Sequence, residues 1–206
     1  SVLVVTIVSI GLVGCLWTWQ QFTAFHQESK DLNEIMLDSH KNLLKIQVQK
    51  SVEYIEYSKS LTQERLRASI QDRTCEAHAI ASHLHGKWKN EKSPEALQTL
   101  VKEALRAMRF NQGRGYFFIL NLDGVVQLQA DRPGSEGENL LAGSDNHETV
   151  MIHREMIDLV TREQEGFYQY DWTRPGQSKG RFSKIAYVKL FRPYNWIIGT
   201  GEYLDD

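Results

Sequence analysis

Glycine and proline, the residues that most strongly interrupt helices, are distributed very unevenly along this chain. Neither occurs from Cys15 to His85, whereas all four prolines lie at Pro94 or beyond. Apolar side chains in the first part recur three or four positions apart, the spacing of one helix face, at Leu44, Val48, Val52 and Ile55. The sequence therefore predicts a long helical region over residues 20–92, with a helix from about Lys30 to Trp88. Poor helix formers around Ser58 allow a kink in it.

The first nineteen residues are almost wholly apolar and carry no charge. As a helix they would rise about 28 Å, close to the thickness of the hydrocarbon core of a bilayer. Trp17 and Trp19 fall where interfacial aromatic residues are common. Residues 1–19 are therefore expected to form a transmembrane helix. Two alternatives stay open, a cleaved signal peptide and lipidation of Cys15, because LVGC (12–15) is similar to a bacterial lipoprotein processing box.

From residue 93 onward the pattern changes to short elements. Ser93 followed by Pro94 favours the start of a helix, and a second helical stripe covers 147–164. Aromatic and β-branched runs between turn residues predict five strands, at 115–120, 125–130, 167–172, 183–191 and 196–203. The expected fold class is α+β: a long, membrane-anchored N-terminal helix packed on a PAS-like five-stranded antiparallel sheet with an inserted helix. The expected domains are 1–19, 20–92 and 93–206.

Composition and motifs exclude several functions. With 24 basic and 26 acidic residues the net charge is −2, so the chain lacks the basic footprint of a nucleic-acid-binding protein. The sequence contains no phosphate-cradling glycine loop, no nucleophile elbow and no zinc-type spacing of Cys and His. We therefore expect no enzymatic activity, no cofactor and no metal in this chain. His147 and His153 are expected at the surface.

The remaining candidates form an aromatic pocket with a few polar groups. Even spacing along a strand places side chains on one face, which groups Tyr170 with Trp172 and Tyr116 with Phe118. A cation in such a pocket would attract a carboxylate, and Arg109 and Lys184 are the candidates. The alternatives are an ordinary aromatic core, a solvated arginine and an edge lysine. The predicted ligand-binding residues are Arg109, Tyr116, Phe118, Gln129, Tyr170, Trp172, Lys184 and Tyr187.

Five segments, taken together in order and spacing, resemble one known family. They are RFNQGRGYFF (109–118), DG (123–124), YDWTRP (170–175), KIAYVK (184–189) and WIIGTGEY (196–203). Over about residues 44–206 the chain resembles a Cache sensor domain of the single-Cache type, also labelled Cache 2. The resemblance implies an extracytoplasmic ligand-sensing module of a bacterial chemoreceptor, histidine kinase or diguanylate cyclase. Family members commonly bind small carboxylates such as acetate, propionate or pyruvate.

One departure from the family pattern concerns the ligand. Where the family often has His-Pro at the end of the second strand, this chain has Gln129 and Ala130. The expected function is the sensing of a small molecule, a short-chain carboxylate, by a domain that lies outside the inner membrane after about residue 20. We also expect a homodimer through the long helix. The alternative is a periplasmic dimerisation or protein-interaction module without a small ligand.

Overall fold

The computed structural model describes residues 2–142, 146–174 and 180–204, with the backbone alone for residues 2–6 and 8. The chain divides into two compact units, Ser1–Ser60 and Leu61–Asp206. One residue of the sequence motifs, Pro175 of YDWTRP (170–175), lies outside the described residues.

Helix α1 covers Val2–Trp88, so it begins well before the expected start near Lys30. It is helical at Ser58, where the sequence allowed a kink. Within the Ser1–Ser60 unit the apolar side chains that the structure describes are exposed, Leu44 and Val48 among them. In the described part of the chain, no helix combines the length and the apolar character that crossing a membrane requires. The segment 1–19 includes residues whose side chains lie outside that description.

The second unit contains a five-stranded sheet in the order β2-β1-β5-β4-β3, with every neighbouring pair antiparallel. This confirms the predicted α+β class with an antiparallel sheet. The strands are β1 Phe118–Asn121, β2 Val126–Gln129, β3 Glu165–Trp172, β4 Phe182–Phe191 and β5 Trp196–Tyr203. β1 starts at Phe118, three residues after the expected start at Gly115. Gly115 instead forms a bridge with Phe110, which closes the segment around the short helix η1 (Asn111–Gly113).

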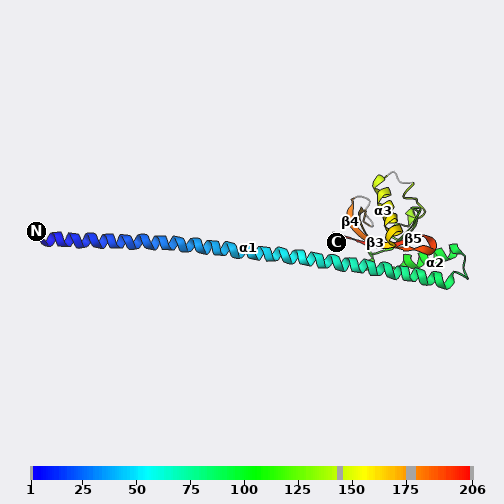
Figure 1. The fold of residues 1–206 in the computed structure, drawn as a ribbon, viewed down its shortest axis with the longest axis horizontal. Coiled ribbons are helices and arrows are strands. Elements are labelled where there is room, and N and C mark those ends of the chain that lie inside the picture. Colours follow the sequence, from blue (N-terminus) through cyan, green and yellow to red (C-terminus); the bar gives the residue numbers. More distant parts are fainter. Residues whose placement is uncertain (1, 143–145, 175–179, 205–206) are drawn as a thin grey trace. The chain divides into compact units, whose positions relative to one another are not determined.

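Helices cover both faces of this sheet (Figure 1). Helix α2 (Pro94–Ala107) and the part of α1 beyond residue 60 lie on one face, and the inserted helix α3 (His147–Glu163) lies on the other. Ser93 caps α2 as expected, since its Oγ accepts a hydrogen bond from the N–H of Ala96 at 3.2 Å. Each face has its own apolar core, so side chains that alternate along a strand enter different cores.

Helix α1 approaches the sheet through small side chains. Thr74, Ala77 and Ala81 are each 0% exposed, and their spacing places them on one stripe of the helix. The Thr74 hydroxyl contacts two carbonyl oxygens, that of Ile70 at 2.9 Å and that of Tyr187 in β4 at 3.2 Å. The helix is therefore joined directly to the backbone of the sheet.

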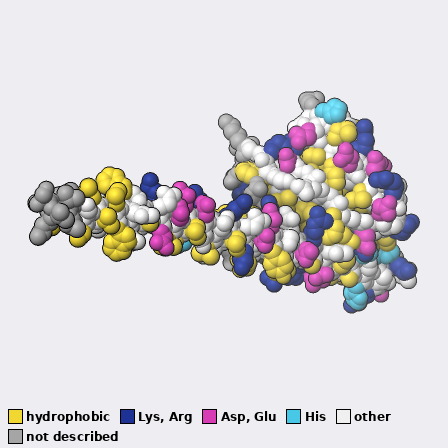
Figure 2. All heavy atoms as spheres, turned by 60° about the vertical axis from the view of Figure 1, so that its left-hand side comes forward, with side chains coloured by type: hydrophobic (Ala, Val, Ile, Leu, Met, Phe, Trp, Pro, Cys, Tyr) yellow, Lys and Arg dark blue, Asp and Glu magenta, His cyan; other side chains and the backbone are white. Residues whose placement is uncertain are grey.

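The outer surface of the Leu61–Asp206 unit is charged but mixed. Basic and acidic side chains alternate over the face seen in Figure 2, with apolar side chains between them. This surface fits a solvated domain whose distinctive chemistry lies inside.

Candidate functional site

The main polar feature of the interior is the side chain of Lys184 in β4, which is only 1% exposed. Its Nζ donates a hydrogen bond to the hydroxyl oxygen of Tyr116 at 2.9 Å. The same nitrogen lies 4.6 Å from the ring centroid of Tyr116 and 5.2 Å from that of Tyr203. Two tyrosine rings thus surround an amine that is shielded from solvent, an arrangement that stabilises its positive charge.

Strand register explains how these groups meet. Lys184 pairs with Tyr170 of β3 on one side and with Tyr203 of β5 on the other. Ala186 and Val188, at even spacing from Lys184, belong to the core beneath α3. The lysine therefore enters the α3 side of the sheet, between two aromatic neighbours that the register fixes.

Electrostatics make this lysine unusual. Burial lowers the pKa of Lys184 to about 8, although the charges of Asp131 and Glu202 favour its protonated form. Burial also raises the pKa of Tyr116, and Asp131 contributes to that shift. At neutral pH the amine is therefore protonated while the phenol is neutral. Among the described residues no carboxylate lies within 4.0 Å of the amine. The buried, positively charged amine of Lys184 can still donate hydrogen bonds, and it therefore favours the binding of an added anion.

A cavity of about 300 Å³ lies on the same side of the sheet. Two predicted site residues, Gln129 and Trp172, line it. The other lining residues come from β2, the segments around α3 and the β3–β4 connection: Val126, Arg132, Ser135, Glu138, Leu140, Asn146, Thr149, His153, Thr173 and Arg181. Its volume suits a small organic molecule, and its wall mixes apolar with hydrogen-bonding groups.

Aromatic side chains connect the lysine to this cavity. The ring of Tyr170, the register partner of Lys184, lies 5.9 Å from that of Trp172 between centroids. Trp172 in turn meets the ring of His153 at 5.7 Å. The expected aromatic face of β3 is therefore present, and it runs from the amine to the cavity wall.

His153 was expected at the surface, and that expectation is wrong. The side chain is buried, and burial lowers the pKa of its imidazole. Its Nδ1 lies 2.7 Å from the carbonyl oxygen of Thr149, which fits a neutral ring that donates from this nitrogen. The helical stripe of α3 could have revealed this, because His153 is four residues after Thr149 and three before Met156, which is buried.

Arg109 is not brought to Lys184 but holds the backbone. One guanidinium nitrogen donates to the carbonyl oxygen of Ala130 at 2.7 Å, and another to that of Arg106 at 2.9 Å. The side chain thus ties the end of α2 to the end of β2. In this arrangement Arg109 positions the backbone, and its contact with a ligand stays a prediction.

Phe118 and Tyr187 also lie elsewhere. Phe118 is a core residue beneath α3, packed so tightly on β5 that a Cβ at Gly199 would come within 2.6 Å of its ring. Tyr187 lies on the opposite face of the sheet, where its hydroxyl accepts a hydrogen bond from Gln71 of α1 at 3.3 Å. An odd separation of three residues from Lys184 already requires opposite faces, so the sequence contained the signal that separates them.

Two residues near the amine were missed by the sequence analysis. Tyr203 was placed in the last strand but not in the site, although the residue paired with an inward lysine must also face inward. Asp131, directly after β2, acts on Lys184 through its charge. No periodic pattern marks Asp131, because it lies in a turn.

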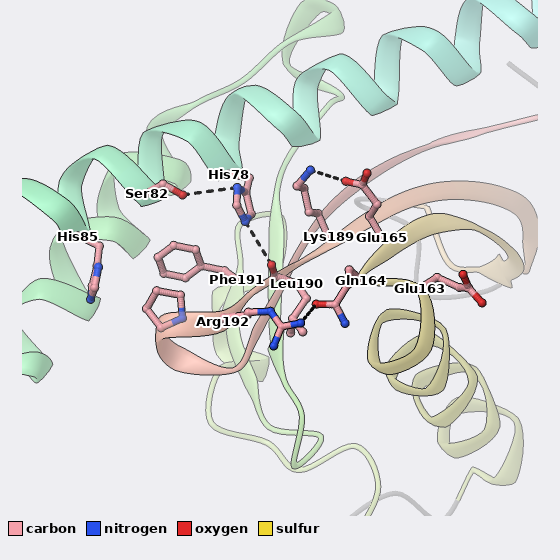
Figure 3. A pocket seen from close by; sticks show the side chains of 11 residues that line it. His78, Ser82, His85, Glu163, Gln164, Glu165, Lys189, Leu190, Phe191 and Arg192 are labelled. Carbon is pink, nitrogen blue, oxygen red and sulfur yellow. Dashed lines mark hydrogen bonds and ion pairs between the residues drawn. The ribbon is translucent and has the colours of Figure 1, made fainter.

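A second hollow, of about 430 Å³, opens on the α1 side of the sheet (Figure 3). Several of its polar side chains contact one another or the backbone. His78 Nε2 lies 3.2 Å from the carbonyl oxygen of Leu190, and Lys189 forms an ion pair with Glu165. Burial lowers the pKa of His78, so this imidazole is neutral at pH 7. The charge of Lys189 thus has a carboxylate partner, which the amine of Lys184 lacks among the described residues. In the described residues, no cluster of three or more His, Cys, Asp or Glu side chains is placed to hold a metal.

The family model for Cache domains (dCache_2) matches residues 21–206. Among curated proteins, the methyl-accepting chemotaxis protein McpP of Pseudomonas putida is 32% identical over 114 residues, 55% of this chain and 20% of McpP. The sensor histidine kinase MctS of Rhizobium johnstonii is 30% identical over 113 residues, 54% of this chain and 23% of MctS. The chain thus spans about a fifth of the length of these relatives.

Solved structures agree with this assignment. A periplasmic sensor domain of a chemotaxis protein superposes with a TM-score of 0.61 at 28% identity, covering 68% of this chain and 95% of that one. A Cache chemosensory domain, described for carboxylic acid recognition, gives a TM-score of 0.61 at 27% identity, covering 68% and 97%. The match over most of the sequence, the five-stranded sheet and these neighbours lead to one conclusion: the chain belongs to the Cache family of sensor domains.

Proposed function

We propose that this chain is the extracytoplasmic sensor domain of a bacterial membrane receptor and that it binds a short-chain carboxylate at Lys184. The observation that carries the proposal is the buried, protonated amine, hydrogen-bonded to Tyr116 and out of contact with any described carboxylate. A carboxylate would supply the missing negative charge and could accept hydrogen bonds from both groups. The neighbouring structure described for carboxylic acid recognition supports this ligand class.

The proposed signal passes through β5. Tyr203, at the end of β5, has its ring over the Lys184 amine, and its hydroxyl donates to the carbonyl oxygen of Thr173 at 2.5 Å. A ligand that engages the amine would change the surroundings of Tyr203 and favour one position of β5. The shift can be no larger than the ligand's preference for that state.

The membrane and dimer parts of the proposal rest on the N-terminal unit. The segment 1–19 would anchor the receptor, with later residues in the periplasm, as in a chemoreceptor or sensor histidine kinase. The exposed apolar side chains Leu44, Val48, Val52 and Ile55 would pair with those of a second copy. The alternative, an interaction module without a small ligand, would use the same helix. The polar-lined cavity favours the sensor.

The direct test is a titration of the purified 206-residue chain with sodium acetate, propionate and pyruvate. At about 100 times its Kd a ligand stabilises by about 2.7 kcal/mol, which corresponds to a rise of about 5–10 °C in Tm for a chain of this size. Acetamide and propionamide, which match the acids in shape without the charge, are the controls, with sodium chloride to match ionic strength. The absence of any shift with every acid would reject the carboxylate sensor.

A further inference from the structure

The turn that follows β2 places a carboxylate close to the site. Gln129 to Arg132 form this turn, closed by a hydrogen bond from the N–H of Arg132 to the carbonyl oxygen of Gln129 at 3.0 Å. Within it, the Gln129 side-chain amide donates to Oδ1 of Asp131 at 2.5 Å. Because Gln129 also lines the cavity, the orientation of the Asp131 carboxylate is tied to the cavity wall.

Two arginines near the end of α2 hold this turn. Arg109 donates to the carbonyl oxygen of Ala130. Arg106 forms a two-pronged ion pair with Glu136, at 2.6 and 2.8 Å, and Glu136 accepts a hydrogen bond from the backbone N–H of Gln129 at 3.0 Å. The backbone directly before Asp131 is thus held at Gln129 and Ala130. The freedom that remains to the carboxylate is in the side chain, which the amide of Gln129 contacts.

The negative charge of Asp131 acts on the groups that would meet a ligand. It favours the protonated form of Lys184 and raises the pKa of both Tyr116 and Tyr203. Yet Asp131 lies beyond 4.0 Å from the amine, since the two form no ion pair. The free domain therefore supplies a nearby counter-charge while leaving the contact positions on the amine open to another anion.

Other charges around the cavity largely balance one another. Arg181 forms an ion pair with Glu148 at 2.8 Å, and Arg132 lines the cavity together with Glu138. The described charges on the wall are those of Arg132, Arg181 and Glu138, and Arg181 is neutralised by its ion pair with Glu148 beside the wall. Of the carboxylates that act on the charge of Lys184, Asp131 has a larger effect than Glu202.

We propose that Asp131 is a specificity-determining residue. Its negative charge is the counter-charge of Lys184 in the free domain, and it repels a carboxylate that binds at this lysine. This inference rests on the proposed carboxylate function of the same site. A ligand with one negative charge meets the attraction of Lys184 and a single repulsion from Asp131. A second negative charge on the ligand would double that repulsion, and within the described ranges Lys184 is the one buried cation that could offset it. The site therefore selects short monocarboxylates over dicarboxylates of similar length.

The test is Asp131→Asn in the full 206-residue chain, with propionate and malonate as probes in calorimetric titrations. The amide keeps an oxygen for the Gln129 hydrogen bond but removes the charge. Removal of a like charge several ångströms away should strengthen propionate binding on the order of tenfold and malonate binding by more than that. The preference for propionate over malonate should therefore shrink. The Tm of the free domain should fall, because Lys184 loses its counter-charge.

A matched control is Asp123→Asn, which removes an exposed carboxylate from the β1–β2 turn and should change neither affinity nor preference. If Asp131→Asn does not fold, Asp131→Ser removes the same charge with a smaller side chain. Unchanged or weaker propionate binding in a folded Asp131 variant would overturn the inference and leave the carboxylate function standing. If the unmodified chain binds neither acid, the proposed function and this inference fail together.

Discussion

The two faces of the sheet are built from alternating residues of the same strands, yet they treat polar groups in opposite ways. On the α1 side, Thr74 and His78 bind backbone carbonyl oxygens of β4. These bonds fasten a helix to the sheet. On the α3 side, the amine of Lys184 donates to the hydroxyl of Tyr116, and none of the carboxylates that the structure describes contacts this amine. The comparison indicates that one face stabilises the domain while the other is prepared for a ligand.

The largest effect should come from removing a large ring on the α1 side. Phe191 is 2% exposed and packs among the rings of His78 and Tyr194. Phe191→Ala should lower the free energy of unfolding by about 3–5 kcal/mol, measured by urea denaturation. The protein that remains folded should bind propionate as before. A large loss of affinity at temperatures where the variant is folded would contradict the division between the faces.

Lys184→Met on the α3 side should instead weaken ligand binding while the domain stays folded. Propionate binding should fall by about 10- to 100-fold, because the ligand loses a charge-assisted contact worth roughly 1.5–3 kcal/mol and its only buried cationic partner among the described residues. The apo domain should stay folded and gain stability, since a buried charge is replaced by an apolar chain of similar length. Calorimetry and thermal melting of the same samples separate the two effects. Unfolding of the variant would show that the lysine is structural.

The pH dependence of stability and of ligand binding should also distinguish the two faces, because burial lowers the pKa of Lys184 from 10.5 to about 8. Between these values the unfolded chain binds more protons than the folded one, so this group makes the free energy of unfolding rise with pH across that window. Carboxylate binding needs the protonated amine, and affinity should fall about tenfold per pH unit above about 8. Titrations at pH 7, 8 and 9 test this. A flat profile would show that the amine does not contact the ligand.

The smallest effects should come from two tyrosine hydroxyls, one on each face. Tyr116→Phe removes the acceptor of the Lys184 hydrogen bond and should weaken propionate binding about tenfold while lowering stability by about 1–3 kcal/mol. Tyr187→Phe removes a hydroxyl that bonds to Gln71 at 3.3 Å and interacts with Glu165, and it should cost about 0.5–1.5 kcal/mol without changing affinity. Equal changes in affinity for both variants would erase the distinction between the faces.

The elements of the fold could be predicted from the sequence because each has a local cause. Alternating aromatic residues, the cap at Ser93 and the turn at Gly124, with its φ of 81°, all act within a few positions. The site was predictable only in part. Strand parity supports the shared face of Lys184 and Tyr170. It does not reach Tyr116, which precedes β1 and packs in the core of Ala77 and Val101. Arg109 and Asp131 depend on how α2 meets the turn after β2, which is a distant contact that no periodicity encodes.

The seam between α1 and β4 has a mechanical consequence. Long side chains between two elements can change rotamer and absorb a small displacement, but Thr74, Ala77 and Ala81 have almost no such freedom. Close-packed contacts transmit strain instead of dissipating it. A fraction of an ångström of movement in β4 should therefore reach the helix nearly undiminished, as a slide or tilt of α1 and not as local repacking.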